Sequence, residues 1–352
     1  MWAASLSHPG RLQQTKLPTS NKAVGPTVKT TLHGHELSYT DTGDGPPVVL
    51  VHGMMSSSKT WSGQVDRLAA EHRVISPDLF GHGDSAKPAG DYSLGAHAAS
   101  LRDLLDAVGI DGATFVGHSL GGGIAMQMAY LFPDRVDAVV LVSSGGLGRE
   151  LNPLLRAATL PGSELVLPVL SSSWVHGIGD TALRLWGKAG LPAVSPSTEE
   201  AWDGLSSLSD GDTRRAFLAT SRSVIDVHGQ TVSAQNRLSG LASRPTMLIW
   251  GERDRIVPSA HVEAAKRELP ATRIEMFSRS GHFPHLDEPD RFAQVLADFM
   301  SDSFSAQRSS EQHPGAKTDD ATSSHPGSVG AQTSETQSIT TETIPAEPTG
   351  TA

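Results

Sequence analysis

Short apolar runs alternate with stretches of helical spacing along most of this chain, and this alternation constrains the fold more than any other feature. Pro47–Val51 is a continuous apolar run, as expected of a strand buried on both faces of a sheet. From Leu94 to Val108, apolar residues recur at helical spacing. Strands that alternate with helices predict an α/β fold, with a mostly parallel, twisted sheet covered by helices on both faces. After a hairpin over Thr27–Thr42, the predicted strands are Pro47–Val51, Val74–Pro77, Ala113–Gly117, Ala138–Ser143, Thr246–Trp250 and Arg273–Phe277, and the predicted helices are Lys59–Ala70, Leu94–Val108, one ending near Phe132, Ser259–Leu269 and Pro289–Met300.

The alternation stops after Gly145-Gly146. Residues 147–235 contain helical patches and three tryptophans, but no convincing strand. Because tryptophans and leucines need a surface to pack on, this segment is interpreted as an inserted helical cap rather than a polar linker. The core of the protein is then divided into a first part, residues 27–146, and a second part, residues 236–302.

Both ends of the chain lack the apolar residues that a core requires. Residues 303–352 form an acidic, Ser/Thr-rich tail, and residues 1–26 have a similar composition. Such segments cannot offset the entropy lost on ordering, so we expect both to be disordered. The tail carries six acidic and two basic residues, which account for −4 of the formal net charge of −10. The folded part is therefore only mildly acidic.

The composition also excludes several kinds of site and partner. Without cysteine the chain has no disulfide framework, no Cys-ligated zinc and no cysteine nucleophile. His33 and His35 lack further ligands at metal spacing, so no metal is expected. The sequence has no basic stripe of the kind that binds nucleic acid. It also has no run of about 18 apolar residues, which a membrane-spanning helix would need. The first residues lack the charged start and apolar core of a signal peptide, so we expect a cytoplasmic location.

The segment Gly117-His118-Ser119-Leu120-Gly121 follows a predicted strand and precedes a predicted helix. A serine hydroxyl is a poor nucleophile, so it needs a base beside it and must stand clear of its own backbone. A sharp strand-to-helix turn exposes the hydroxyl but crowds the residues two positions before and after it. Gly117 and Gly121 relieve that crowding, and the helix points its positive end at Ser119.

An acid and a base for Ser119 follow two later strands. Asp254 comes after the strand Thr246–Trp250, and His282 comes after Arg273–Phe277. The carboxyl ends of parallel strands meet at one edge of a sheet, where ligands gather, so both should lie near Ser119. Glu252 and Asp226 compete with Asp254 for the role of the acid. No carboxylate occurs between Ser143 and Glu150.

These motifs together resemble the α/β-hydrolase superfamily over about residues 30–300. The matching segments are Val51-His52-Gly53, Asp78–Ser85, Gly117–Gly121, Trp250–Asp254 and Gly281-His282. The resemblance implies that Ser119 attacks an acyl carbonyl and that His282 takes its proton. It also implies that Asp254 orients and stabilises the imidazole, in the chain order typical of this fold.

The resemblance further implies an oxyanion hole made by the backbone N–H groups of Met54 and Leu120. His52 is expected to brace the loop that contains Gly53. With lower specificity, a substrate pocket is predicted to be lined by His118, Gly146, Trp174, Trp186 and Phe283.

A serine at position 119 disfavours the dehalogenases and epoxide hydrolases of this architecture, which need an aspartate there. The leading interpretation is a cofactor-independent hydrolase that cleaves a carboxylic ester of a small to medium apolar substrate with water. One alternative is a carbon–carbon bond hydrolase of meta-cleavage products, because Val142–Gly148 resembles the matching segment of those enzymes. Arg149, Arg184 and Arg222 are then candidates for holding the carboxylate of such a ketone substrate. A perhydrolase or acyltransferase and a non-catalytic binding protein also remain open, and the sequence gives no oligomeric state.

Overall fold

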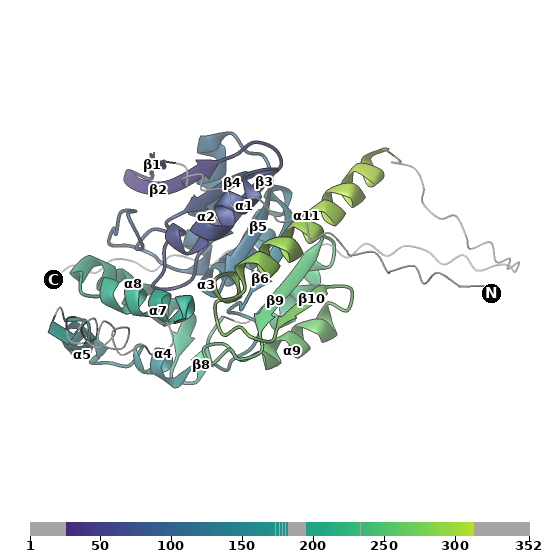
Figure 1. The fold of residues 1–352 in the computed structure, drawn as a ribbon. Helices are drawn as coiled ribbons and strands as arrows, with labels where there is room; N and C mark the ends of the chain where they lie inside the picture. The colour runs from purple at the N-terminus through teal and green to yellow at the C-terminus, as the bar shows by residue number, and fades with distance from the viewer. Residues whose placement is uncertain are drawn as a thin grey trace, which may run out of the picture. The chain divides into compact units, whose positions relative to one another are not determined.

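A single sheet of eight strands lies at the centre of the protein. The computed structural model describes residues 26–312, apart from residues 173, 176, 178, 180, 182–194 and 233. The strands of this sheet are β1 (Thr27–Leu32), β2 (His35–Thr42), β3 (Pro47–Val51), β4 (Arg73–Pro77), β5 (Ala113–His118), β6 (Val136–Val142), β9 (Thr246–Gly251) and β10 (Arg273–Phe277). Their order is β1-β2-β4-β3-β5-β6-β9-β10 (Figure 1). Only the β1–β2 and β2–β4 pairs are antiparallel, so the predicted mostly parallel sheet is confirmed.

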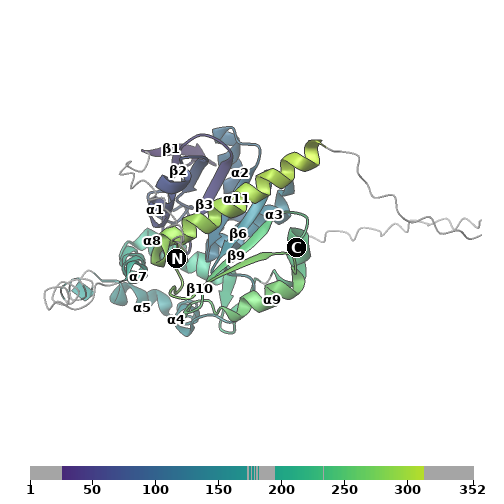
Figure 2. The ribbon, with the colours of Figure 1, turned by 45° about the vertical axis from the view of Figure 1, so that its right-hand side comes forward.

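Helices cover both faces of the sheet, as predicted. One face packs against α1 (Ser62–Leu68) and α11 (Pro289–Gln312), and the other against α2 (Leu94–Val108), α3 (Leu120–Leu131) and α9 (Ala260–Glu268). Figures 1 and 2 both show α11 running across the sheet. In β3, Val48 and Leu50 pack in the apolar cluster on the face covered by α1 and α11. Val49 and Val51 pack in the cluster on the opposite face, under α2, α3 and α9. Because successive side chains point to opposite faces, a strand covered on both sides needs an unbroken apolar run.

Most of the predicted elements agree with the structure to within a few residues. The helix predicted over Lys59–Ala70 is divided into a 3-10 turn, η1 (Ser58–Trp61), and α1. Helix α11 was predicted to end at Met300 but continues to Gln312, so the first residues assigned to a disordered tail are helical. The shorter elements are η2 (Pro133–Arg135), η3 (Gln235–Leu241) and α10 (Pro284–Asp287).

The segment between β6 and β9, residues 147–235, is called the insertion here. Its described helices are α4 (Pro153–Ala157), α5 (Ser163–Leu170), α7 (Pro196–Ser207) and α8 (Gly211–Val224). The expectation that it has no strand is wrong, because β7 (Ile225–Asp226) and β8 (Gly229–Gln230) form a short antiparallel hairpin. The turn is made by Gly229, whose φ of 126° suits only glycine, and by the Asp226 carboxylate, which accepts from His228 N–H at 2.7 Å.

The insertion packs on the residues that follow β3. Leu167, Leu208 and Phe217 form a small apolar cluster that also contacts Met54 and Met55. In Figure 1 the helices of the insertion gather at one end of the sheet. That end is therefore the one where β3 finishes, which is also the end expected for a site in a parallel sheet.

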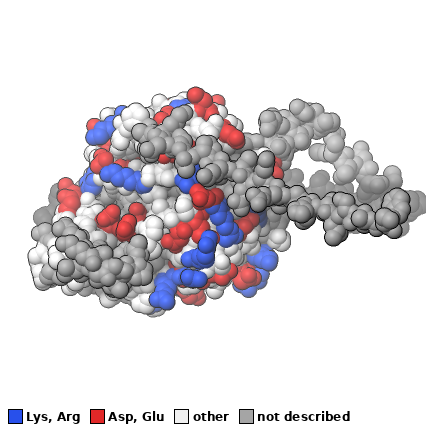
Figure 3. All heavy atoms as spheres, viewed as in Figure 1, with Lys and Arg blue, Asp and Glu red and all other residues white. Residues whose placement is uncertain are grey.

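The charges on the surface are mixed. On the part of the face that Figure 3 draws in colour, lysine and arginine side chains are interspersed with aspartate and glutamate. Of the helices in the described residues, none combines the length and apolarity that a membrane span needs.

Candidate active site

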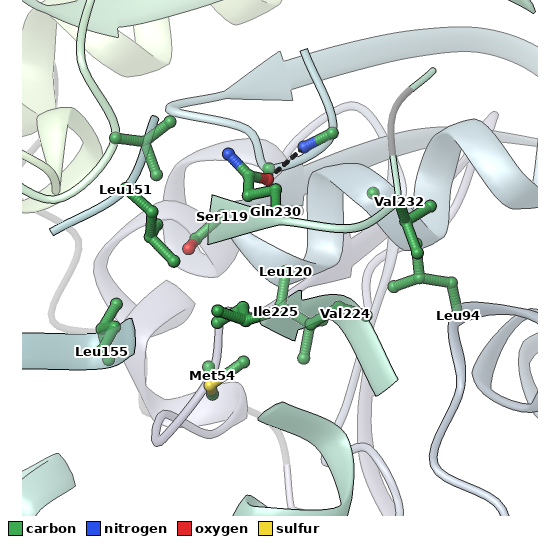
Figure 4. A pocket seen from close by; sticks show the side chains of 14 residues that line it. Met54, Leu94, Ser119, Leu120, Leu151, Leu155, Val224, Ile225, Gln230 and Val232 are labelled. Carbon is green, nitrogen blue, oxygen red and sulfur yellow. Dashed lines mark hydrogen bonds between the residues drawn. The ribbon is translucent and has the colours of Figure 1, made fainter. Parts of the chain in front are cut away.

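Ser119 occupies a sharp turn between β5 and α3. Its φ of 54° and ψ of −114° are unusual for a residue with a side chain, and such conformations cost about 1–3 kcal/mol. Backbone hydrogen bonds hold the turn: Ser119 N–H donates to Val142 O at 2.9 Å, and Gly145 N–H donates to Ser119 O at 2.9 Å. The turn points the Ser119 side chain out of the sheet and into a pocket (Figure 4).

The two glycines of the motif have the steric role that the sequence predicted. A Cβ atom at Gly117 would lie 2.6 Å from Gly122 N and overlap the Gly121 carbonyl. A Cβ atom at Gly121 would lie 2.7 Å from His52 O and overlap the carbonyl oxygen of Val51. Both glycines therefore allow close contacts between backbone segments rather than unusual dihedral angles.

His282 and Asp254 form a buried hydrogen-bonded pair. Their side chains are 7% and 0% exposed, and His282 Nδ1 lies 2.8 Å from Asp254 Oδ2. Asp254 Oδ1 accepts the backbone N–H groups of Ile256 at 2.8 Å and Val257 at 3.0 Å. A carboxylate can only accept, so Nδ1 of His282 carries the proton and Nε2 is free to act as a base.

The competing acids lie elsewhere. Asp226 is 41% exposed and lies 3.8 Å from His228 Nδ1, and Glu252 is exposed at the surface. Of the three carboxylates considered from the sequence, Asp254 alone meets His282.

His52 braces the loop after β3. Leu79 N–H donates to His52 Nε2 at 3.0 Å, so Nε2 is unprotonated and Nδ1–H donates to Gly53 O at 2.8 Å. Burial lowers the pKa of His52, which keeps it in this neutral form. The Gly53 carbonyl and the Met54 N–H belong to one trans peptide and point in opposite directions. By fixing the Gly53 carbonyl, His52 also fixes the direction of the Met54 N–H.

The Met54 and Leu120 amides are available to a ligand. Within the described residues neither N–H has a hydrogen-bond acceptor, and Leu120 N–H lies in the first turn of α3, where the helix supplies none. A Cβ atom at Gly53 would lie 3.1 Å from Ser119 Cβ, so the Gly53–Met54 peptide lies beside the serine.

His118 has a different place from the one predicted. Its side chain does not line the pocket but lies buried, with Nε2–H donating to the His282 carbonyl oxygen at 2.8 Å. The His118 ring is 4.8 Å from the His282 ring and 4.9 Å from the ring of His285. His118 therefore fixes the loop that carries His282, a role that the sequence did not predict.

Five histidines around the site are neutral at pH 7. Burial is the main cause of the lowered pKa of each, and nearby histidines lower the pKa of four of them further. The pKa of His97 is lowered to about 4 and that of His285 to about 3, while those of His82 and His118 lie well below the usual value. His52, described above, is the fifth. These five side chains therefore add no positive charge to the site at pH 7.

The pocket in front of Ser119 is apolar. The enclosed cavity has a volume of about 60 Å³, and it opens to solvent at its mouth. Figure 4 shows aliphatic side chains from the core and the insertion surrounding the Ser119 hydroxyl. Only Ser119 and Gln230 contribute polar side chains among the described lining residues, which are Met54, Leu94, Ser119, Leu120, Gly123, Gly145, Gly146, Leu151, Leu155, Val224, Ile225, Gln230, Val232 and Val257.

Of the predicted pocket residues, Gly146 lines the pocket. Phe283 instead packs its ring against His118 at 4.9 Å and His282 at 5.2 Å, and Trp174 is 63% exposed on the insertion. These two placements correct the prediction, because tertiary contacts rather than the local sequence pattern decide where Trp174 and Phe283 lie. Trp186 lies outside the described residues. The sequence analysis did not predict that the β7–β8 hairpin lines the pocket. The apolar residues beside it, Val224-Ile225 and Val232, were the sequence signal that could have indicated this.

No group of three or more His, Cys, Asp or Glu side chains within the described ranges is arranged to hold a metal ion.

Comparison with known proteins gives consistent relatives. A family model described as alpha/beta hydrolase fold matches residues 46–289. An uncharacterized protein of Mycobacterium tuberculosis is 39% identical over 271 residues, covering 77% of this chain and 80% of that protein. The 2-hydroxymuconate semialdehyde hydrolase of Pseudomonas putida is 26% identical, covering 76% and 92%. A solved N-acyl homoserine lactone degrading enzyme is 27% identical, with a TM-score of 0.59, covering 77% of this chain and all of that one.

Gly121→Ala tests the close backbone contact beneath Ser119. The added methyl group would push α3 away from Val51 and His52, so we expect the free energy of unfolding to fall by about 3 kcal/mol. Urea denaturation measures the change. Gly90→Ala is the matched control, since nothing lies within 4 Å of a Cβ atom there. Equal stability of the two variants would show that the contact tolerates a side chain.

Stability should fall in acid because of the buried histidines. The pKa of His97 is about 4 in the folded protein against 6.5 for a free histidine, so the unfolded chain binds more protons in that window. The free energy of unfolding therefore decreases as pH falls from about 6.5, by up to about 1.4 kcal/mol per pH unit for each such histidine. We expect His97→Gln to reduce that slope by about 1 kcal/mol per unit between pH 4 and 6.

Urea titrations at each pH measure the slope. His35→Gln, at an exposed position, controls for the loss of a histidine as such. The same slope in His97→Gln and the unmodified protein would mean that His97 titrates normally.

Proposed function

The chain belongs to the family of proteins with the alpha/beta hydrolase fold, and from this premise we propose that it is a serine hydrolase that cleaves a carboxylic ester of a small to medium apolar substrate. The observation that carries the proposal is that Ser119 opens into a pocket whose described lining has no charged side chain. An uncharged ester loses little by leaving water for such a pocket, whereas a charged substrate would lose its hydration without a partner.

The proposed reaction has two halves. Ser119 Oγ bonds to the ester carbonyl carbon while His282 Nε2 takes its proton, and the electron pair of the carbonyl bond moves to oxygen. The Met54 and Leu120 N–H groups stabilise that oxyanion, and one such donor is worth about 3 kcal/mol in the transition state. When the intermediate collapses, the alcohol leaves with the proton from His282. Water, deprotonated by His282, then attacks the acyl-enzyme and releases the carboxylic acid and Ser119.

Asp254 supports both proton transfers. Its carboxylate accepts three N–H groups, one of them from His282, and is fully buried. It therefore keeps the imidazole in the tautomer that presents a free Nε2 and stabilises the imidazolium as it forms. His118 acts on the same loop through the His282 carbonyl, as a positioning residue.

Carbon–carbon bond hydrolysis is the second candidate, supported by the similarity to the Pseudomonas putida hydrolase. A meta-cleavage product carries a carboxylate, which needs a cation in the pocket. Arg222 instead pairs with Glu164 at 2.5 Å, Arg149 is exposed, and Arg184 lies outside the described residues. The described lining thus favours the ester. If the protein bleaches a coloured dienol substrate faster than it hydrolyses esters, carbon–carbon bond hydrolysis becomes the favoured function.

Transfer of the acyl group to an acceptor other than water uses the same acyl-enzyme, and product analysis with added alcohol or peroxide separates it from hydrolysis. A non-catalytic binding protein would retain a substrate analogue without turnover.

A fluorophosphonate probe tests the proposed nucleophile. We expect stoichiometric labelling of the unmodified protein at Ser119, read by peptide mass spectrometry, and a burst of p-nitrophenol from short-chain esters. Ser119→Ala should lose the label and all turnover while unfolding at the same urea concentration. Ser100→Ala, on α2 and outside the pocket, is the matched control and should keep both. Near-full activity of Ser119→Ala would sink the proposal.

A further inference from the structure

Gln230 is a polar side chain in an otherwise apolar pocket. It lies in β8, on the hairpin of the insertion, and is 7% exposed. A side chain whose only task was to tie the hairpin to the core could lie behind the wall, but Gln230 belongs to the lining together with Ser119 (Figure 4). A buried amide that faces a ligand cavity is a group that a substrate can use.

The orientation of the Gln230 amide follows from its partners. Gly146 N–H can only donate, and it lies 2.6 Å from Oε1, so the oxygen must face Gly146. Nε2 then points to the other side, where it has one long contact of 3.4 Å to the Glu150 carbonyl oxygen. Nε2 carries two hydrogens, and within the described residues the second has no acceptor. Burying a donor without an acceptor is unfavourable, so a ligand oxygen that accepts from this N–H would be bound more tightly.

The Gln230 amide lies one residue away from the backbone of Ser119. A Cβ atom built at Gly145 would lie 3.1 Å from Gln230 Oε1 and 3.6 Å from Ser119 O, so one residue separates the two. The Gly145-Gly146 segment joins them, because Gly145 N–H donates to Ser119 O and Gly146 N–H to Gln230. Gln230 and Ser119 therefore line the same pocket with one residue between them.

On the basis of the ester hydrolysis proposed above, we propose that Gln230 Nε2 donates a hydrogen bond to a second, uncharged oxygen of the substrate. The preferred substrates are then neutral esters or lactones that carry an ether, keto or amide oxygen a few atoms from the scissile carbonyl. In a pocket without such a donor, replacing a methylene group by oxygen lowers affinity, since the oxygen loses its water. In this pocket, a substrate oxygen at one position can accept a hydrogen bond from Gln230 Nε2, which replaces the lost water.

Pairs of esters that differ by one methylene-to-oxygen exchange test this. Two series, with the exchange at successive positions of the acyl chain or of the alcohol, are compared by kcat/KM after correction for hydroxide-catalysed rates. In the unmodified protein we expect the oxygen-to-methylene ratio to peak at one position in one series, which also identifies the side that contacts Gln230. A ratio that stays below one at every position in both series would overturn the inference without any variant.

Gln230→Glu is the sharper variant, because its carboxylate keeps an acceptor for Gly146 N–H but lacks the Nε2 donor. We expect the ratio at the peak position to fall about tenfold in Gln230→Glu and in Gln230→Met, the size of one neutral hydrogen bond. Val232→Ala, at another lining position, should slow both members of a pair equally and keep the ratio. An unchanged ratio in both Gln230 variants would leave Gln230 as an anchor of the hairpin only.

The failure of this inference differs from the failure of the proposed function. Turnover of the methylene esters with a flat ratio contradicts only the role of Gln230. Absence of turnover in every pair, with no fluorophosphonate label on Ser119, contradicts ester hydrolysis and the substrate preference together.

Discussion

The contact between the backbone of α3 and the end of β3 is the constraint on which the rest of the site depends. Gly121 lies against the carbonyl oxygens of Val51 and His52 with no room for a side chain. This contact brings the first turn of α3 together with the Gly53–Met54 peptide, on either side of Ser119. The Met54 and Leu120 N–H groups and a serine in a strained conformation are held together by this backbone contact and by the hydrogen bond from His52 to the Gly53 carbonyl.

Burial keeps the histidines that contact this backbone uncharged, because it lowers their pKa. His52 and His118 are kept neutral, and each uses one ring nitrogen to hold a segment of the site: His52 the Gly53 carbonyl, and His118 the carbonyl of His282. A cation at His118, with its ring 4.8 Å from that of His282, would oppose the imidazolium that the proposed mechanism needs. The histidines thus form structural hydrogen bonds without carrying charge, whereas Asp254 supplies a negatively charged partner to His282.

The sequence predicted the sheet, its helices and the meeting of Asp254 with His282, because these follow from local rules. A short unbroken apolar run such as Pro47–Val51 is typical of a strand between two layers, and side chains that follow parallel strands share one edge of the sheet. The pocket could not be predicted in this way. Its walls come partly from the insertion, where tertiary contacts decide which residues face inward, so Trp174 and Phe283 were misplaced and Gln230 was missed. The extension of α11 to Gln312 was missed because those residues are polar and carry no apolar periodicity.

A crystal structure of the protein after reaction with a p-nitrophenyl alkylphosphonate tests the account most directly, because the phosphonyl oxygen mimics the oxyanion. We predict phosphorus bonded to Ser119 Oγ, with that oxygen about 2.7–3.1 Å from both Met54 N and Leu120 N. The alkyl chain should extend into the apolar pocket. An adduct at another residue, or an oxygen that faces away from both amides, would contradict the account.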